Sequence, residues 1–194
     1  MTSRVLDRDR AALVVVDVQE AFRPAVLDFE RVAQNAAVLV QGAQILGLPV
    51  VATEQYPKGL GHTVPEVAEH LGGLRPPTPA ASRQDTPQIL RLEKVCFAAT
   101  DADGFDLDGR DQAIVCGIES HVCVSQTAHG LLDRGLEVHV ARDAVSSRSA
   151  ENRELGLHKM ESAGAVVTSV ETALFELLGA AGSDEFKQVQ GLVK

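Results

Sequence analysis

Three residues of this 194-residue sequence have side chains that together could carry out acyl transfer. Asp17 follows the apolar run AALVVV, Lys94 ends the segment ILRLEK, and Cys123 lies in the segment GIESHVCV. A cysteine attacks a carbonyl carbon as its thiolate, and its ordinary pKa is about 8.5. A neighbouring ammonium and a helix N-terminus favour the thiolate, and a carboxylate can carry the proton to a leaving group. We therefore expect a base, Asp17, a nucleophile, Cys123, and a charge, Lys94, that lowers the thiol pKa and orients both.

Each of these residues also has an ordinary structural interpretation. Asp17 is compatible with a turn or a helix cap, Lys94 with a solvated surface side chain, and Cys123 with a small core residue. Ligands of open parallel sheets bind beyond the carboxyl ends of the strands. All three residues are expected at that edge, which weakens the three structural interpretations together.

Apolar runs alternate with amphipathic segments along the chain, and this alternation predicts a parallel sheet with helices on both faces. We expect an α/β fold, a three-layer αβα domain over residues 1–194, with a doubly wound, mostly parallel six-stranded sheet in the order 3-2-1-4-5-6. The expected strands are residues 11–17, 48–53, 89–97, 112–117, 136–144 and 165–169. The expected helices are residues 28–47, 65–71, 120–135, 149–164 and 170–179.

The bulk composition limits the partners and the compartment. The formal net charge is −9, and no basic stripe offsets it, so we expect a small-molecule substrate and no nucleic-acid partner. Three irregularly spaced cysteines do not make a disulfide framework, which favours the reducing cytoplasm. The N-terminal apolar run, residues 11–16, is too short for a signal segment or a membrane span, so we expect no membrane association.

Three segments of the sequence resemble the signature segments of the isochorismatase-like cysteine hydrolase family. They read LVVVDVQEAF, EKVCF and GIESHVCVSQTA, and the similarity runs over about residues 12–179. The segment TEQYPKGLGHTVPE further resembles a subgroup of mostly uncharacterised hydrolases in that family. The resemblance implies a three-layer α/β fold and a catalytic triad of Asp17, Lys94 and Cys123.

The departures from the family narrow the expected chemistry. Nicotinamidases of the family have a metal-binding D-x-H pair after the second strand, and this sequence has TEQYPKG there, so we expect no metal and no cofactor. Isochorismatases proper often lack the cysteine because they cleave a vinyl ether, so Cys123 favours an amide-type C–N bond. The chain has no G-x-G-x-x-G after a strand and no G-x-S-x-G elbow, which removes support for a dinucleotide cofactor and for a serine hydrolase.

Further residues are expected to complete the site. We expect Gln19, Phe22 and Tyr56 to line the substrate pocket. Related proteins are known for a cis peptide bond between non-proline residues at the position of Ile118 and Glu119. Backbone N–H groups of this turn would form an oxyanion hole with that of the nucleophile.

Other candidates carry less support. The acidic segment DADGFDLDG lacks the spacing of an EF-hand loop. His121 and Cys123 are two residues apart on an expected helix and diverge by about 200°, so they cannot share a zinc ion with Cys116. Arg148 and Arg153 are interpreted as surface charges.

Two further expectations concern the oligomeric state and an alternative to enzymatic activity. The family commonly forms oligomers, and the last expected helix presents Leu174, Leu177 and Leu178 with little polar cover, so we expect a homo-oligomer. The alternative to a hydrolase is a non-catalytic binding or scaffold protein that retains the hydrolase fold.

Overall fold

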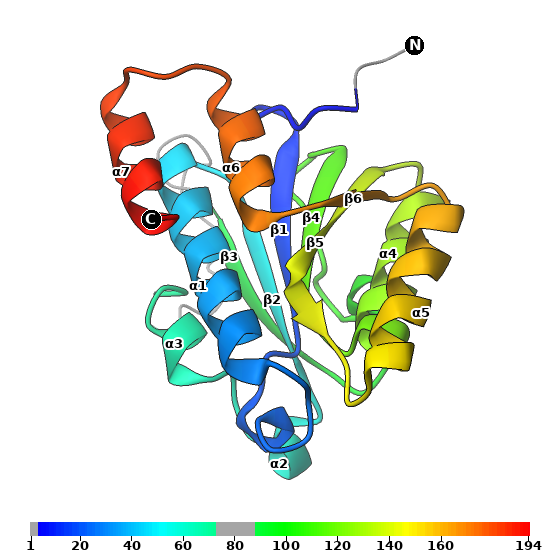
Figure 1. The fold of residues 1–194 in the computed structure, drawn as a ribbon. Coiled ribbons are helices and arrows are strands. Elements are labelled where there is room, and N and C mark those ends of the chain that lie inside the picture. Colours follow the sequence, from blue (N-terminus) through cyan, green and yellow to red (C-terminus); the bar gives the residue numbers. More distant parts are fainter. Residues whose placement is uncertain (1–3, 73–87) are drawn as a thin grey trace.

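The computed structural model describes residues 4–72 and 88–194 and contains one six-stranded sheet in which every paired neighbour is parallel (Figure 1). The strand order is β3-β2-β1-β4-β5-β6, so the predicted order is confirmed. The strands are β1 (Ala11–Val16), β2 (Val50–Gln55), β3 (Ile89–Lys94), β4 (Gln112–Ile118), β5 (Glu137–Ser146) and β6 (Val166–Thr168). The third strand ends three residues earlier than the sequence predicted, because the chain turns away after Lys94.

Helices cover both faces of the sheet (Figure 1). On one face lie α1 (Phe29–Leu46), α6 (Val170–Leu178) and α7 (Asp184–Leu192); on the other lie α4 (Ser125–Asp133) and α5 (Ala150–Ser162). Side chains of β1 alternate between the two cores: Leu13 and Val15 face α1, whereas Val14 and Val16 face α4 and α5. This alternation is why the central strands read as continuous apolar runs in the sequence.

The C-terminal helices differ from the expectation. The sequence predicted that α6 exposes three leucines, but Leu174 and Leu177 are buried and Leu178 packs against the same core. The unpredicted helix α7 lies beside α6 and α1 and completes this layer (Figure 1). An exposed apolar face on α6 is therefore no argument for oligomer formation.

The stretch between β2 and β3 contains two short helices, α2 (Pro57–Leu60) and α3 (Pro65–Ala68). Only the second was predicted, and it ends three residues earlier than expected. The predicted loop over residues 73–86 lies outside the described residues.

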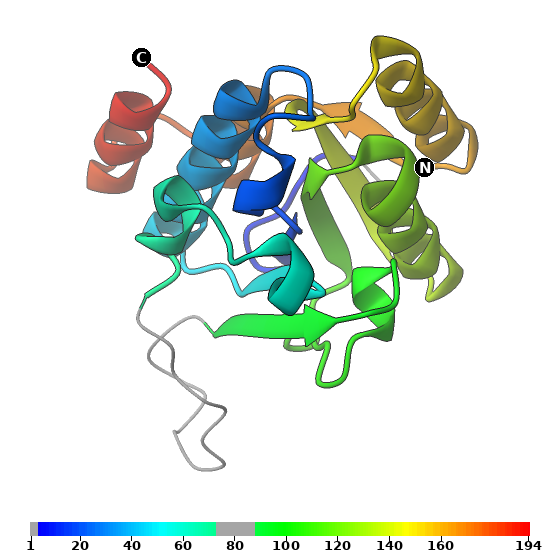
Figure 2. The same cartoon turned by 90° about the horizontal axis from the view of Figure 1, so that it is seen from below.

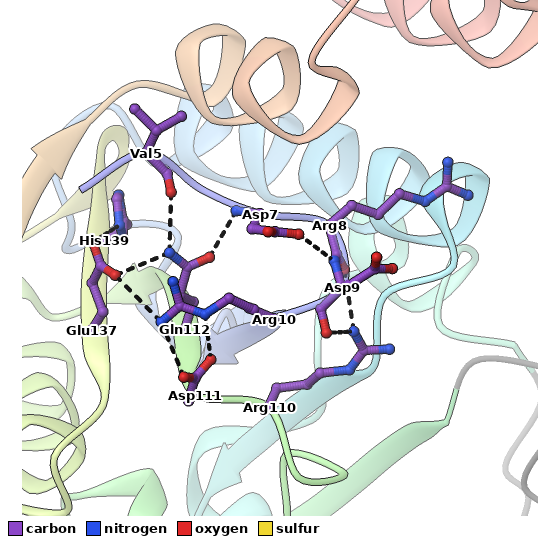
Figure 3. Close-up of polar contacts among 10 residues, drawn as sticks. All are labelled: Val5, Asp7, Arg8, Asp9, Arg10, Arg110, Asp111, Gln112, Glu137 and His139. Atoms are coloured by element: carbon purple, nitrogen blue, oxygen red, sulfur yellow. Dashed lines mark hydrogen bonds and ion pairs between the residues drawn. The ribbon is translucent and has the colours of Figure 1, made fainter. Parts of the chain in front are cut away.

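Different polar residues lie at the two ends of the strands, which are called the carboxyl edge and the amino edge of the sheet. The carboxyl ends of the strands meet on the side of α2, and Figure 2 looks onto this edge. At the amino edge, a polar network ties the N-terminal segment to β4 and β5 (Figure 3). There the buried Gln112 side chain accepts from the Asp7 N–H and donates to the Val5 carbonyl and to Glu137. Any site formed by the three predicted residues must therefore lie at the carboxyl edge.

Candidate active site

Asp17 stands where β1 leaves the sheet. Its backbone is left-handed, with φ of 52°, a conformation that aspartate tolerates better than most residues, and its side chain is fully buried. The Thr53 hydroxyl donates to Oδ1 at 2.7 Å, and the Lys94 ammonium donates to Oδ2 at 2.7 Å. Both carboxylate oxygens are therefore paired, which holds the side chain in one orientation.

Lys94 ends β3 and carries its ammonium into the same place, with no exposed side-chain surface. Besides Asp17, Nζ contacts the Gln55 side-chain oxygen at 2.7 Å and the carbonyls of Phe97 and Cys96 at 3.0 and 3.2 Å. A buried ammonium requires both a counter-charge and hydrogen-bond acceptors, and Lys94 has them. This explains why a lysine is buried at this edge.

Gln19 was predicted to line the substrate pocket, but its side chain is buried and hydrogen-bonds with the backbone of Gln55, whose side chain contacts Lys94. Its side-chain oxygen accepts from the backbone N–H of Gln55 at 2.7 Å, and its amide nitrogen donates to the carbonyls of Gln55 and Gly61. The residue is fully buried. All this hydrogen-bonding is used within the protein, so the side chain of Gln19 acts on the site through Gln55 and Lys94.

Cys123 is carried by a tight turn between β4 and α4. Gly117 has φ of 117°, and a Cβ there would lie 2.0 Å from the Val16 carbonyl oxygen, so only glycine fits this close approach. The Ile118–Glu119 peptide bond is cis, as the resemblance implied. The predicted helix begins with a π-helical turn, Ser120–Val124, and Cys123 lies inside it with 7% of its surface exposed. π-helical turns occur frequently at functional sites.

The protonation state of Cys123 differs from the sequence-based expectation. Burial, followed by the charge of Asp17 and a hydrogen bond with its carboxylate, raises the pKa of the thiol to about 12, and the charge of Lys94 opposes this rise. The sequence predicted a lowered pKa because it counted the lysine charge as acting on the thiol. In the structure that charge is paired with Asp17, so the resting thiol is neutral and faces a carboxylate.

A cavity of about 380 Å³ opens beside this group. It is lined by Tyr56, Pro57, Lys58, Glu93, Lys94, Val95, Cys96, Asp101, Ala102 and Asp103. Tyr56 lies in the wall of this cavity, and Phe22 packs against the core on the α1 side; the contact of both residues with substrate stays a prediction. Of the three candidate residues, Lys94 belongs to the lining of this cavity, and Asp17 and Cys123 do not.

The sequence interpretation missed the link between Glu119 and Arg148. The Glu119 side chain is 5% exposed and accepts from the Arg148 backbone N–H and from both arms of its guanidinium, at 2.7–3.0 Å. Arg153 is not a free surface charge either, because its guanidinium donates to the carbonyls of Val145 and Arg142. The two partners of the first pair lie 29 residues apart, and no spacing rule indicates such a contact.

The described residues contain no cluster of side chains suited to bind a metal ion. Within residues 4–72 and 88–194, no group of three or more His, Cys, Asp or Glu side chains is placed to hold an ion. His121 instead contacts the Ser147 hydroxyl at 3.0 Å, and Cys116 is a buried strand residue whose thiol pKa is raised by burial. In the same ranges, none of the helices is both long and apolar enough to cross a membrane.

The three-layer α/β fold, with its parallel sheet in the order 3-2-1-4-5-6, is the fold of the isochorismatase-like proteins. The chain belongs to the isochorismatase family, since residues 11–172 match the isochorismatase domain. It is 38% identical over 183 residues to isochorismatase domain-containing protein 2 of Danio rerio, covering 94% of this chain and 86% of that protein. It is 37% identical over 189 residues to the secreted isochorismatase effector Isc1 of Phytophthora sojae, covering 95% and 84%.

Solved structures agree with this assignment. The MAR1 ribonuclease from Caenorhabditis elegans superposes with a TM-score of 0.83 at 38% identity, over 97% of this chain and 92% of that one. YcaC from Pseudomonas aeruginosa, solved with covalent acrylamide, gives 0.78 at 25% identity, over 99% and 93%. YcaC of Escherichia coli, described as an octameric hydrolase of unknown specificity, gives 0.74 at 24% identity, over 93% and 85%. Family membership supports a hydrolase role for this chain.

Proposed function

We propose that this protein is a cofactor-independent cysteine hydrolase that cleaves an amide-type C–N bond in a small carbonyl compound. The observation that carries the proposal is the buried carboxylate of Asp17, paired with Lys94 and placed against the thiol of Cys123. A charged pair without any exposed side-chain surface is costly to bury. Perturbed, buried groups that converge beside a cavity are typical of catalytic sites.

The proposed reaction begins with the neutral thiol. Asp17 takes the proton as the sulfur of Cys123 bonds to the substrate carbonyl carbon, and the carbonyl oxygen becomes negative. When the C–N bond breaks, Asp17 returns this proton to the departing amine and a thioester remains. Asp17 then takes a proton from an attacking water molecule, and the acid product leaves as the thiol is reprotonated. Lys94 stabilises the carboxylate form of Asp17 at the start of each half-reaction.

The neighbour solved with covalent acrylamide supports a reactive nucleophile in this fold, because acrylamide is an electrophile that thiols attack. We propose no metal-dependent step, since the D-x-H pair of the metal-binding relatives is missing from the segment TEQYPKG. Ile118 and Glu119 are proposed to contribute only backbone groups to the oxyanion site, and Tyr56 to contact the substrate.

RNA is the second substrate class to be tested, because three of the similar solved structures are described as MAR1 ribonucleases. The net charge of −9 disfavours it, since nucleic-acid affinity comes mainly from lysine and arginine contacts to phosphates. The side chains that line the cavity include Glu93, Asp101 and Asp103, and all three are exposed. We therefore favour a small amide over RNA.

The assembly and the compartment remain proposals. We propose that the protein forms a homo-oligomer. The support for this proposal is the set of exposed apolar side chains at the carboxyl edge, Tyr56, Val95 and Phe97, because the leucines of α6 are covered. Sedimentation giving 20.6 kDa at micromolar concentration contradicts it. The three cysteines are free, which is compatible with the proposed cytoplasmic location, although one relative is described as secreted.

The decisive experiment is a substrate screen of small amides, ureas, activated esters and a single-stranded RNA. Wild type is compared with Cys123→Ala, and Cys96→Ala is the matched control because Cys96 lines the cavity without belonging to the triad. We expect hydrolysis of at least one amide that Cys123→Ala abolishes and Cys96→Ala retains. RNA cleavage that persists without the thiol refutes the proposal. If no compound of the screen is turned over and acrylamide labels Cys123 no faster than Cys96, the non-catalytic scaffold is the better description.

A further inference from the structure

Two segments far apart in the sequence are joined residue by residue beside the nucleophile. Residues 119–121 precede Cys123, and residues 146–148 leave the end of β5. The Ser120 hydroxyl donates to the Ser146 carbonyl at 3.0 Å, and His121 contacts the Ser147 hydroxyl at 3.0 Å. The third connection is the ion pair of Glu119 with Arg148. Each of the residues 119–121 therefore contacts one of the residues 146–148.

The ion pair is the strongest of the three connections. Arg148 gives both guanidinium arms and its backbone N–H to a carboxylate that is almost completely buried. Burial alone raises the pKa of Glu119, but the hydrogen bonds and charge of Arg148 outweigh it and hold that pKa below its ordinary value. The arginine side chain is itself 64% exposed, so the charge pair lies at the surface on one side only. Bidentate pairing of this kind fixes orientation as well as charge.

The backbone of Glu119 also holds the turn that carries Cys123. Its carbonyl oxygen accepts from the N–H groups of Val122 and Val124, at 3.0 and 3.2 Å, and these residues flank Cys123 on both sides. A shift of the Glu119 backbone therefore moves the thiol directly. The negative charge of Glu119 also acts on the thiol and adds to the rise of its pKa.

We propose that Arg148 is a positioning residue for Cys123: it fixes the turn through Glu119 and neutralises a carboxylate that otherwise opposes the negative charge of the reacting group. The inference rests on the proposed hydrolase function. Negative charge appears on the substrate oxygen as the thiol attacks, and an unpaired buried carboxylate nearby disfavours that charge. Arg148 touches no reacting atom, so its effect passes entirely through Glu119.

The test compares Arg148→Met with Arg142→Met, since Arg142 is exposed on β5, the strand that leads to Arg148, and forms no ion pair among the described residues. We expect Arg148→Met to lower kcat by about tenfold to a hundredfold with a much smaller change in KM, as for a small misplacement of a catalytic group. Arg148→Lys keeps the charge and loses the planar fork, and we expect an intermediate value. The control is expected to stay within twofold of wild type, within the scatter of about 0.4 kcal/mol typical for surface substitutions.

A second substitution separates the electrostatic role from a merely structural one. In Arg148→Met, burial acts on Glu119 without the arginine, so the pKa of Glu119 rises, and His121 and Cys123 are the other titratable groups that act on it or respond to it. Activity of the single variant is then expected to fall further as pH rises through the ionisation of Glu119. The double variant Glu119→Gln/Arg148→Met lacks this step and is expected to recover part of kcat.

Acrylamide labelling of Cys123, followed by mass spectrometry against Cys96, gives a readout that needs no known substrate. We expect the labelling rate to fall in Arg148→Met and not in Arg142→Met. If wild-type Cys123 is no more reactive than Cys96 and no amide is hydrolysed, the proposed function fails and this inference with it. If wild type is active and Arg148→Met matches the control in kcat and in labelling, the function stands and the positioning role of Arg148 is wrong.

Discussion

Removal of the lysine from the buried pair tests the core of the proposed site. In wild type, the Asp17 and Lys94 side chains are both without exposed surface and 2.7 Å apart. The substitution Lys94→Met keeps the length of the side chain but leaves the charged carboxylate of Asp17 buried without a cation, with the Thr53 hydroxyl and the Cys123 thiol as its hydrogen-bond partners among the described residues. Breaking a buried pair from one side typically costs about 3–5 kcal/mol of unfolding free energy, and we expect a loss in this range.

The opposite substitution, Asp17→Asn, is expected to cost less. Lys94 keeps three acceptors, the side-chain oxygen of Gln55 and the carbonyls of Cys96 and Phe97, so its ammonium stays hydrogen-bonded. We expect a loss of about 1.5–3 kcal/mol, the range for one hydrogen bond to a charged group. Both variants are expected to lose hydrolase activity completely, because the base is missing in one and loses its charge partner in the other.

Urea unfolding followed by far-ultraviolet circular dichroism measures both losses, since the chain has no tryptophan and a single tyrosine. The double variant Asp17→Asn/Lys94→Met removes both charges and is expected to be more stable than the sum of the single losses predicts, by about 2 kcal/mol. The reasoning is refuted if Lys94→Met is no less stable than Asp17→Asn, or if the two losses simply add.

Three further predictions follow from particular residues. Gly117→Ala places a Cβ 2.0 Å from the Val16 carbonyl at a positive φ, so we expect a loss of more than about 2 kcal/mol or a failure to fold, whereas Gly191→Ala on α7, with no atom within 4 Å, is expected to be neutral or stabilising in the same urea assay. Burial lowers the pKa of His139, and the charge of Arg4 adds to this effect while Glu137 and Glu176 oppose it; the neutral imidazole is therefore favoured by folding, and this part of the stability is present above about pH 6.5 and lost as pH falls below it. His139→Leu is expected to flatten that acid limb of the stability curve. Because burial raises the pKa of Cys123 to about 12, no thiolate absorbance that disappears in Cys123→Ala is expected below about pH 9, and a titration near neutral pH contradicts this.

The sequence and the structure agree most closely where the local pattern reflects burial on both sides. β1 is a continuous apolar run, β4 is one after its first residue, and β2 begins with one; such runs are typical of strands buried in a parallel sheet. The alternation with amphipathic helices gave the layer architecture and the strand order. The helix α7 was missed because its segment DEFKQVQGL is polar and short, and only Val189 of it is fully buried. Its position depends on the groove beside α1 and α6, which no local pattern contains.

In the candidate site, too, local sequence patterns indicated some residues, and only tertiary contacts revealed the others. Residue types and strand ends identified Asp17, Lys94 and Cys123, because an aspartate, a lysine and a cysteine at the carboxyl edge of one sheet can meet whatever the intervening loops do. No local pattern indicates the contacts of Arg148 with Glu119 or of Gln19 with Gln55, because each contact joins segments that are distant in the sequence.

Amino-acid types and their order thus determined which elements form and which reactive groups share an edge of the sheet, since hydrophobic periodicity and strand-end placement are local properties. Only the tertiary structure decided which charge pairs with which group. The Lys94 ammonium lies 2.7 Å from the Asp17 carboxylate and is paired with it, and burial together with the charge of Asp17 raises the pKa of the Cys123 thiol against the opposing charge of Lys94. The pKa of a buried group depends on distances and desolvation across the whole fold, and neither can be read from spacing along the chain.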